Sequence, residues 1–382
     1  MENKLKALIA SGDEKNRAKW AQEWKKQGKK VIGMLCTYAP VELVYASGVL
    51  PWYVIGTPHS NTPLALMYRA PNTCRYSNHV LESFLREEFN FLDGIIGTDW
   101  DDDSRALFDV LEYLGKAPFG FILHLPHQDF PIAHRMLASD MSSLRTALQD
   151  FAGKEISDES IRHAANIYNK TRTLIMKAYE LRKREVPPLS GAEFFRITLA
   201  ALVMPPEEFN SRFEELLPYL EERKTSLKNV RPRVMISSDR LHNVGYLDLI
   251  EEIGPLVAMD DLDTGSRYFS ELVDTNADDI IYALAQRYMR RSGCPRMIEW
   301  NRQVKTIIAQ AKEFKIDGVI ELPLQNSWLR QMRVNFLARS LAEAGISNIS
   351  LLREYHLANI GQLRTRIQAF GEVLEARVTA SE

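Results

Sequence analysis

The sequence predicts an α/β protein in which two parallel-sheet domains of the Rossmann or flavodoxin type are separated by a helical segment. Short β-branched and apolar runs alternate with helical patterns over residues 30–125, and the same alternation returns at Arg231. Residues 131–228, in contrast, show only long helical periods. Alternating strands and helices are typical of a parallel sheet with helices on both faces. The expected regions are therefore an N-terminal α/β domain at 1–130, a helical segment at 131–230 and a C-terminal α/β domain at 231–382.

The N-terminal α/β region is expected to contain four strands. A lysine-rich, amphipathic helix over Met1–Lys30 comes first and lacks the apolar core of a signal peptide. Pro40 and Glu42 then open a helix, because proline fits the first turn and an acid suits the positive end of the helix dipole. Two further helices are expected at 78–89 and 104–114. The expected strands, all short apolar runs, are 30–35, 49–55, 92–97 and 119–125.

After residue 130, the sequence pattern changes first to long helices and then back to alternating strands and helices. Long helices are expected at 133–153 and 157–184, the second with Ser157 as a candidate N-cap. The α/β pattern then restarts, and Asp317-Gly318 repeats the Asp93-Gly94 pair that precedes a strand in the first region. Open α/β sheets bind ligands in the loops that follow their strands. The elements expected here are strands at 233–237, 256–259, 316–322 and from Ser350, with helices at 246–253 and 360–375.

Charge and composition exclude several classes of protein. The 382 residues include 48 basic and 50 acidic side chains, a formal net charge of −2, which argues against a nucleic-acid-binding surface dominated by charge. No apolar stretch reaches the ~18 residues of a membrane span. Three cysteines are too few for a disulfide framework, and their odd number fits a reducing compartment. We therefore expect a soluble, cytoplasmic protein that binds neither nucleic acid nor membrane.

The sequence also lacks the motifs of several common enzyme classes. No P-loop, G-x-G-x-x-G or G-x-S-x-G is present, which argues against a self-contained NTPase, an ordinary nicotinamide enzyme and an α/β-hydrolase. An acidic run at 99–103 follows a strand. It either binds a hard cation or caps the helix that begins near Ser104, and the second interpretation is favoured. Asp260, Asp261 and Asp263 allow the same two interpretations.

Each cysteine lies in a loop or at the boundary of an element. Cys36 follows the first strand, Cys74 lies between elements, and Cys294 precedes Pro295. Free cysteines are often buried packing residues, but thiolates near strand ends can also ligate a soft metal or an iron–sulfur cluster. Because no C-x-x-C pair is present, spacing alone leaves both interpretations open.

Motifs near both ends of the chain point to a family. Residues 31–43 read VIGMLCTYAPVEL, Ala46-Ser47-Gly48 and Leu50-Pro51 follow, and residues 361–370 read GQLRTRIQAF. These segments resemble the G-x-x-C-T-Y-x-P-x-E-[LI], A-[AS]-G, L-P and G-Q-L-x-T-R-x-x-A-F signatures of the 2-hydroxyacyl-CoA dehydratase and benzoyl-CoA reductase family. With Asn72-Thr73-Cys74 and the two Asp-Gly strands, the resemblance covers nearly the whole chain. The N-terminal stretch looks most like the smaller subunit of the reductases.

The resemblance implies a function that composition does not reveal. Such a subunit has two α/β domains, holds a [4Fe–4S] cluster between them, and works with a homologous second subunit in a heterodimer or heterotetramer. A separate ATP-dependent activator injects one electron at low potential. The dehydratases expel water from a 2-hydroxyacyl-CoA through a ketyl radical, and the reductases dearomatise an aryl-CoA. The absence of a P-loop in this chain fits this scheme, because ATP is handled by the activator while the substrate of the subunits is an acyl-CoA.

The family's ligands carry over only in part. By resemblance, Cys36 and Cys74 match two cluster-ligating cysteines. The usual third cysteine follows the second Asp-Gly strand, where this chain has Asn326, and Cys294 is the candidate that would complete the set of metal ligands. Two main hypotheses remain open: a cluster-bearing enzyme subunit, or a degenerate, non-catalytic partner subunit without a complete cluster. A binding protein on the same scaffold is a third.

Residues beside Cys36 are the remaining site candidates. Thr37, Tyr38 and Glu42 could donate to cluster sulfurs or to substrate and so tune the reduction potential. Thr37 is thus expected in cofactor binding, and Tyr38 and Glu42 in catalysis. For Glu42, the alternative is a simple charge at a helix N-terminus.

Overall fold

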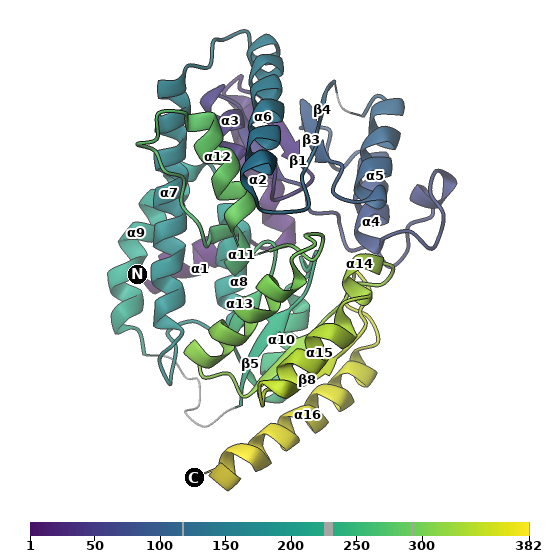
Figure 1. The fold of residues 1–382 in the computed structure, drawn as a ribbon, viewed down its shortest axis with the longest axis vertical. Helices are drawn as coiled ribbons and strands as arrows, with labels where there is room; N and C mark the ends of the chain where they lie inside the picture. Colours follow the sequence, from purple (N-terminus) through teal and green to yellow (C-terminus); the bar gives the residue numbers. More distant parts are fainter. Residues whose placement is uncertain (117, 225–231, 292, 382) are drawn as a thin grey trace.

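Two four-stranded parallel sheets form the centre of the computed structural model (Figure 1). The structure describes residues 1–116, 118–224, 232–291 and 293–381. The strand orders are β2-β1-β3-β4 and β6-β5-β7-β8, which confirms the expected α/β fold with two flavodoxin-like parallel sheets. The strands are β1 (Val31–Met34), β2 (Leu50–Tyr53), β3 (Gly94–Thr98), β4 (Phe119–Leu123), β5 (Arg233–Ser237), β6 (Leu256–Asp261), β7 (Gly318–Glu321) and β8 (Ser347–Ser350).

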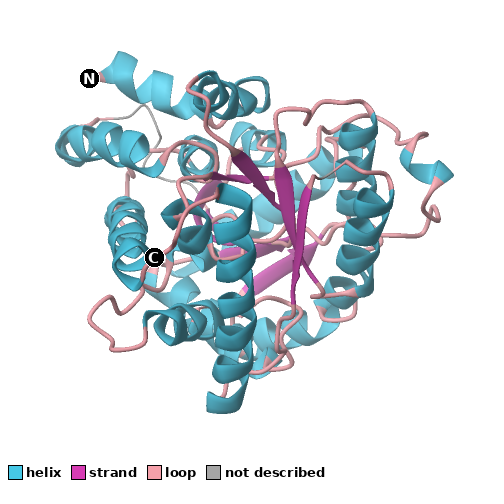
Figure 2. Cartoon of the chain, turned by 90° about the horizontal axis from the view of Figure 1, so that it is seen from above, coloured by secondary structure: helices cyan, strands magenta, loops and turns pink. Residues whose placement is uncertain are grey.

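Helices surround the strands on all sides in the view from above (Figure 2). Before and within the first sheet these are α1 (Glu2–Ser11), α2 (Glu14–Lys26), α3 (Val41–Ala46), the 3₁₀ helix η1 (Ala65–Met67), α4 (Arg75–Leu85) and α5 (Asp102–Tyr113). The middle segment contains α6 (Pro131–Ala152), α7 (Asp158–Leu181), α8 (Gly191–Ala201) and α9 (Pro206–Glu222). The C-terminal part contains α10 (Gly245–Ile253), α11 (Ser266–Phe269), α12 (Ile280–Arg290), α13 (Trp300–Glu313), α14 (Trp328–Gln331), α15 (Val334–Glu343) and α16 (Ile360–Ser381).

The two sheets repeat one local arrangement. Asp93 accepts a hydrogen bond from the backbone nitrogen of Val31 at 2.8 Å, and Asp317 accepts one from that of Arg233 at 2.7 Å. In each sheet, the aspartate thus pairs with the first N–H of the central strand, β1 or β5. The glycine after it begins the neighbouring strand, β3 or β7. The Asp-Gly repeat in the sequence therefore marks equivalent positions in two sheets with the same strand order.

The helices of the middle segment pack against elements of both sheets. Helix α6 contacts β4 and α12, α7 contacts α3 and α11, and α8 contacts β6. Ser157 caps α7 as expected, accepting from the backbone nitrogen of Ser160 at 3.2 Å. One continuous apolar core includes Ile32 of β1, Leu144 of α6 and Ile236 of β5. The boundary expected at residue 230 lies outside the described residues.

The single helix expected over Met1–Lys30 is wrong, because two helices occupy this stretch. They are α1 and α2, which are separated at Gly12 and Asp13. A Cβ atom added to Gly12 would lie 1.9 Å from the carbonyl oxygen of Arg196 in α8. The close packing of α1 on α8 thus requires glycine here, and the chain turns before Asp13, whose extended backbone begins α2.

Two strand boundaries also differ from expectation. Strand β8 ends at Ser350, where the apolar pattern predicts that a strand begins. Because β8 is a half-buried edge strand with polar residues, no apolar run marks it in the sequence. Strand β6 extends through Asp260 and Asp261, two residues beyond the end expected at residue 259.

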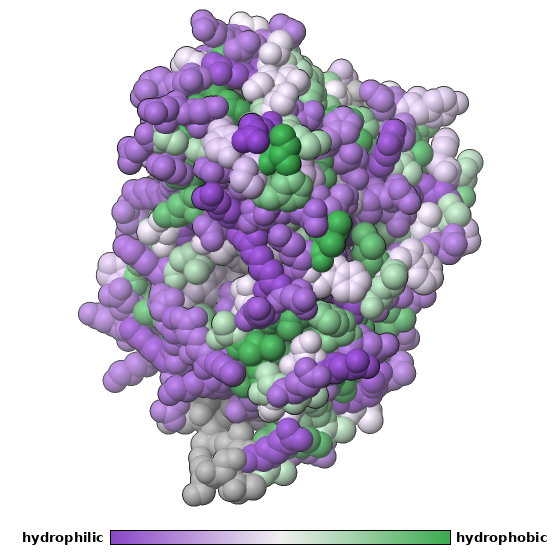
Figure 3. All heavy atoms as spheres, in the orientation of Figure 1, coloured by the Kyte–Doolittle hydropathy of each residue, from purple (hydrophilic) through white to green (hydrophobic). Residues whose placement is uncertain are grey.

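The outer surface is mostly polar on the face shown in Figure 3. Apolar side chains form small patches there, one of them over α13 and α15. Within the described part of the chain, no helix combines the length and apolar character needed to cross a membrane.

Candidate functional site

The carboxyl ends of the central strands of the two sheets meet at one place. In each sheet the strand order reverses between a central pair, β1 and β3 or β5 and β7, and ligands bind at such switch points. Arg240, which follows β5, donates from Nη1 to the carbonyl oxygen of Leu35 after β1, at 2.9 Å. We call the place where these loops meet the inter-sheet junction. It comprises residues 35–38, 98–103, 237–240 and 321–327.

A cavity of about 450 Å³ opens at the inter-sheet junction. One wall is the ring of Trp100 stacked on His127, with centroids 5.1 Å apart and planes at 12°. Loops from both sheets contribute to the lining, so the cavity belongs to neither sheet alone. The lining residues are Cys74, Asp99, Trp100, Asp101, Asp102, Asp103, His127, Arg296, Ser327, Trp328 and Leu329.

Other groups of the protein pair with Asp101 and Asp103, two aspartates of the acidic run at 99–103. Asp101 is the N-cap of α5, where it accepts from the backbone nitrogen of Ser104 at 2.7 Å, and it also pairs with Arg296. Burial would raise the pKa of Asp101, but Arg296 and the bond from Ser104 together hold it well below its usual value. Asp103 pairs with Arg69 at 2.7 Å. The helix-capping interpretation is confirmed for Asp101.

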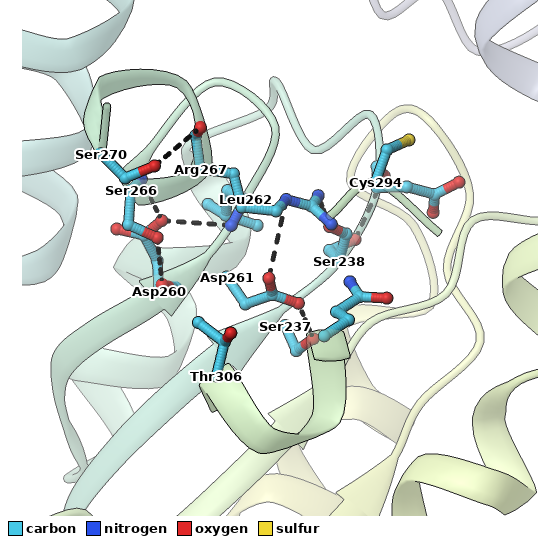
Figure 4. A network of polar contacts seen from close by, with 12 residues as sticks. Ser237, Ser238, Asp260, Asp261, Leu262, Ser266, Arg267, Ser270, Cys294 and Thr306 are labelled. Atoms are coloured by element: carbon cyan, nitrogen blue, oxygen red, sulfur yellow. Dashed lines mark hydrogen bonds and ion pairs between the residues drawn. The ribbon is translucent and has the colours of Figure 1, made fainter. Parts of the chain in front are cut away.

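Asp260 and Asp261 form a separate buried network at the end of β6 (Figure 4). The hydroxyl of Tyr179 donates to Asp260. The hydroxyl of Ser237 donates to Asp261 at 2.7 Å, and the guanidinium of Arg267 lies 3.6 Å from the same carboxylate. Hydroxyl and guanidinium partners thus occupy these two carboxylates.

Cys74 lines the cavity and is the N-terminal flanking residue of α4. It is 3% exposed. Burial, together with the nearby carboxylates of Asp101 and Asp103, raises the pKa of its thiol to about 11. The thiol is therefore protonated at neutral pH, whereas nucleophilic attack requires the thiolate.

Cys36 lies in a different environment. It follows β1 and lines a void of about 10 Å³, which has room for one water molecule at most. This void shares no lining residue with the cavity beside Cys74. The hydroxyl of Thr37 accepts a hydrogen bond from Nη2 of Arg291 at 3.0 Å. The Thr37 side chain is thus bound to the C-terminal half of the chain.

Cys294 is held by aromatic residues from the N-terminal half. Its Sγ accepts a hydrogen bond from the indole nitrogen of Trp100 at 3.0 Å, and its backbone nitrogen donates to the hydroxyl of Tyr38 at 3.3 Å. The guanidinium of Arg291 lies 3.6 Å from the centre of the Tyr38 ring. In Figure 4 the sulfur points away from Asp261. Tyr38 and Cys294 thus help to join the two halves of the chain.

Glu42 is fully buried in the first turn of α3. It pairs with Arg172 of α7 and accepts from the hydroxyl of Tyr288 of α12 at 2.8 Å. Burial alone would raise the pKa of Glu42, but Arg172 and Arg287 outweigh this effect and lower it. The catalytic roles of Glu42 and Tyr38 stay predictions. In this structure, both side chains are engaged by buried partners.

The structure does not bring Cys36, Cys74 and Cys294 together as a ligand set. In the part of the chain that the structure describes, no group of three or more His, Cys, Asp or Glu side chains is arranged to hold a metal ion. The alternative ligand, Asn326, donates to the carbonyl oxygen of Pro71 at 3.3 Å. A [4Fe–4S] cluster is held by thiolates that converge on one space. The three thiols as placed do not fit such a cluster.

The inter-sheet junction depends on arginines that no motif singles out. Arg296 pairs with Asp101, and its Nη1 lies 3.9 Å from Sγ of Cys294. The Arg240 guanidinium lies 4.2 Å from the centre of the Tyr76 ring. The only available signal is position, because one arginine follows the end of a strand and the other follows a cysteine by two residues.

Comparison with known proteins places the chain in a family. A family model described as 2-hydroxyglutaryl-CoA dehydratase, D-component, matches residues 36–374. The chain is 25% identical over 358 residues to (R)-2-hydroxyglutaryl-CoA dehydratase, subunit beta, of Acidaminococcus fermentans, which covers 92% of this chain and 94% of that protein. It is 24% identical over 356 residues to the (R)-phenyllactyl-CoA dehydratase beta subunit of Clostridium sporogenes, covering 91% and 92%. It is 25% identical over 265 residues to a benzoyl-CoA reductase subunit of Thauera aromatica, covering 68% of each. Since the family model spans most of its length, this chain belongs to the 2-hydroxyglutaryl-CoA dehydratase D-component family, in agreement with the resemblance seen in its sequence motifs.

Proposed function

We propose that this chain is one subunit of a heteromeric, cytoplasmic enzyme that acts on a CoA thioester, either by dehydrating a 2-hydroxyacyl-CoA or by reducing an aryl-CoA. Its partner is a homologous second subunit, and an ATP-dependent activator supplies the assembly with electrons at low potential. The family match over residues 36–374 supports this proposal, as do relatives whose names identify them as single subunits of dehydratases and of a reductase.

Within this assembly, we assign the [4Fe–4S] cluster to the partner subunit. The observation that carries this assignment is the placement of Cys36, Cys74 and Cys294, which form no three-donor group among the described residues. The chain then acts as the partner that completes the heteromer. The competing candidate is a cluster-bearing subunit, which is favoured by the match of Cys36 and Cys74 to two family ligand positions.

Anaerobic co-expression with a homologous second subunit and the activator tests the proposal. We expect the two subunits to co-purify, and turnover of a panel of 2-hydroxyacyl-CoA and aryl-CoA thioesters to require both. Iron and acid-labile sulfide, measured on each subunit after separation, should follow the partner. A chain that neither binds a homologous subunit nor supports turnover of any thioester would contradict the proposed function.

A further inference from the structure

We infer that this chain closes its inter-sheet junction with a buried guanidinium–carboxylate network in place of a metal centre, so that its fold and its binding to the partner do not depend on iron. We call this set, made of Asp101, Asp239, Arg240, Arg296 and Ser327, the junction network. The inference deepens the proposed function and rests on it only for the identity of the partner subunit.

Arg296 is the link between the two sheets. Its guanidinium pairs with Asp101, which follows β3 of the first sheet, and its Nη1 lies 4.0 Å from the carboxylate of Asp239, which follows β5 of the second. Asp239 also accepts from the hydroxyl of Ser327, which follows β7. Asp101, Asp239 and Arg296 are all largely buried. The carboxylates that follow β3 and β5 thus share one guanidinium, and a hydroxyl that follows β7 bonds to one of them.

Arg240 makes a second connection across the same junction. Besides its bond to Leu35, its Nη2 lies 3.5 Å from the hydroxyl of Ser104 in α5, and its guanidinium stacks on Tyr76 of α4. Leu35 directly precedes Cys36. Arg240 thus ties the second sheet to the backbone that immediately precedes Cys36.

A cluster would be an alternative reason for arginines at the inter-sheet junction. Guanidinium groups can stabilise an anionic centre, so their charge alone does not decide the question. The space available for a cluster and the placement of its candidate ligands decide it. The void at Cys36 holds about 10 Å³, the larger cavity is reached by Cys74 and not by Cys36, and Sγ of Cys294 is already bonded to Trp100. Arg296 pairs with Asp101, and Arg240 donates to the carbonyl oxygen of Leu35.

The stability of buried ion pairs explains how such a network can hold the two sheets together without a metal centre. Breaking a buried ion pair by removing one partner is strongly destabilising, because the other charge is left uncompensated. The contacts of Arg296 with Asp101 and of Arg240 with Leu35 join one half of the chain to the other. Loss of one link should therefore weaken the closed arrangement whether or not iron is supplied.

The first test measures metal and stability on the full chain purified anaerobically, alone and with its partner subunit. We expect less than about 0.2 iron per chain after separation from the partner, on the scale of the four irons of one cluster. Neither bathophenanthroline nor air should shift the melting temperature of the isolated chain. The single variants Cys36→Ser, Cys74→Ser and Cys294→Ser should leave iron content and co-purification unchanged.

The second test removes the central link. Arg296→Met should lower the melting temperature by about 5 °C with or without added iron and sulfide, and adding Asp101→Asn should recover part of that loss. Arg105→Met is the matched control, because Arg105 is exposed and lies 4.0 Å from Asp109. It should leave the melting temperature unchanged.

Opposite results would overturn the inference. They are about four irons per chain that are lost in Cys36→Ser, a melting temperature that falls on chelation, or an Arg296→Met variant as stable as the Arg105→Met control. If iron is found on this chain but the partner still co-purifies and turnover occurs, the inference and the assignment of the cluster to the partner both fail, while the proposed role as a subunit of a CoA-thioester enzyme stands. If no partner binds while the chain remains iron-free and stable, the proposed function fails and the inference stands.

Discussion

At the scale of single residues, Glu42 illustrates how burial decides between a surface charge and an internal ion pair. The sequence places it in the first turn of a helix, where an acid is ordinarily solvated. In the structure it is inaccessible, paired with Arg172, and bonded to the hydroxyl of Tyr288. The partners come from helices more than 100 residues away in the chain, so no local pattern reveals them.

Glu42→Gln should destabilise the chain by about 3–5 kcal/mol, because it leaves Arg172 buried without a counter-charge. Urea unfolding at pH 7 measures the change. The lowered pKa of Glu42 means that its charge stabilises the fold fully above the usual value of 4.5 and that this stabilisation is lost as pH falls through the lower folded value. The difference between wild type and variant should therefore shrink in acid.

Glu208→Gln is the matched control for Glu42→Gln. Its partner, Arg212, lies one helical turn away and both side chains are largely exposed. Such a surface pair contributes about 0–1 kcal/mol. A Glu42→Gln variant that unfolds like wild type, yet abolishes thioester turnover in the assembled enzyme, would instead support the catalytic role expected from the family resemblance.

Cys74 carries a second residue-scale prediction, on the reactivity of its thiol. Because burial and two aspartates raise its pKa to about 11, alkylation by iodoacetamide should rise about tenfold per pH unit from pH 7 to 10, following the thiolate fraction. Peptide mass spectrometry of Cys74 gives the rate. Asp103→Asn removes one of the carboxylates and should speed the reaction at pH 8. A rate that levels off near pH 10 would mean that the thiol ionises at its ordinary pKa of about 9.

At the scale of elements, the sequence predicts a helix or strand well only where the interactions that form it are local. The buried strand β1 is recognisable because a strand covered on both faces needs a continuous apolar run. The capping of α5 by Asp101 is likewise a matter of a few residues. The break between α1 and α2 is not local, since it arises where Gly12 meets the backbone of α8, far along the chain. The edge strand β8 is polar and gives no signal at all.

Gly12→Ala tests the contact that separates α1 from α2. The added methyl group has no room against the carbonyl of Arg196, so we expect a loss of about 1–3 kcal/mol in the free energy of unfolding. Gly361→Ala is the control, because Gly361 lies in the first turn of α16 with nothing within 4 Å of its added Cβ. It should be neutral or stabilising by about 0.5–1 kcal/mol. Equal effects of the two substitutions in urea unfolding would show that α1 does not pack closely on α8.

At the scale of the whole molecule, the sequence predicts where the site lies better than it predicts which side chains meet there. Motifs at both ends of the chain and the alternating pattern predict the family and a site at the strand ends between two sheets. The position of Cys294 relative to Cys36 and Cys74 depends on how the two sheets are set against each other, because Cys294 belongs to the second α/β region and the other two belong to the first. Arg240 and Arg296 make contacts between the two sheets, and no local sequence pattern reveals those contacts.

The same contacts predict that the two sheets unfold together. One apolar core contains Ile32 of β1 and Val234 of β5, and α6 and α7 contact elements of both halves. Calorimetry should therefore show one transition, with a van't Hoff enthalpy close to the calorimetric enthalpy. Val234→Ala, which opens a space in β5 alone, should also lower hydrogen-exchange protection of the β1 amides, because both strands belong to the same cooperative unit. Two resolved transitions, or β1 protection that is unaffected by Val234→Ala, would show that the junction holds two independently folding domains together only loosely.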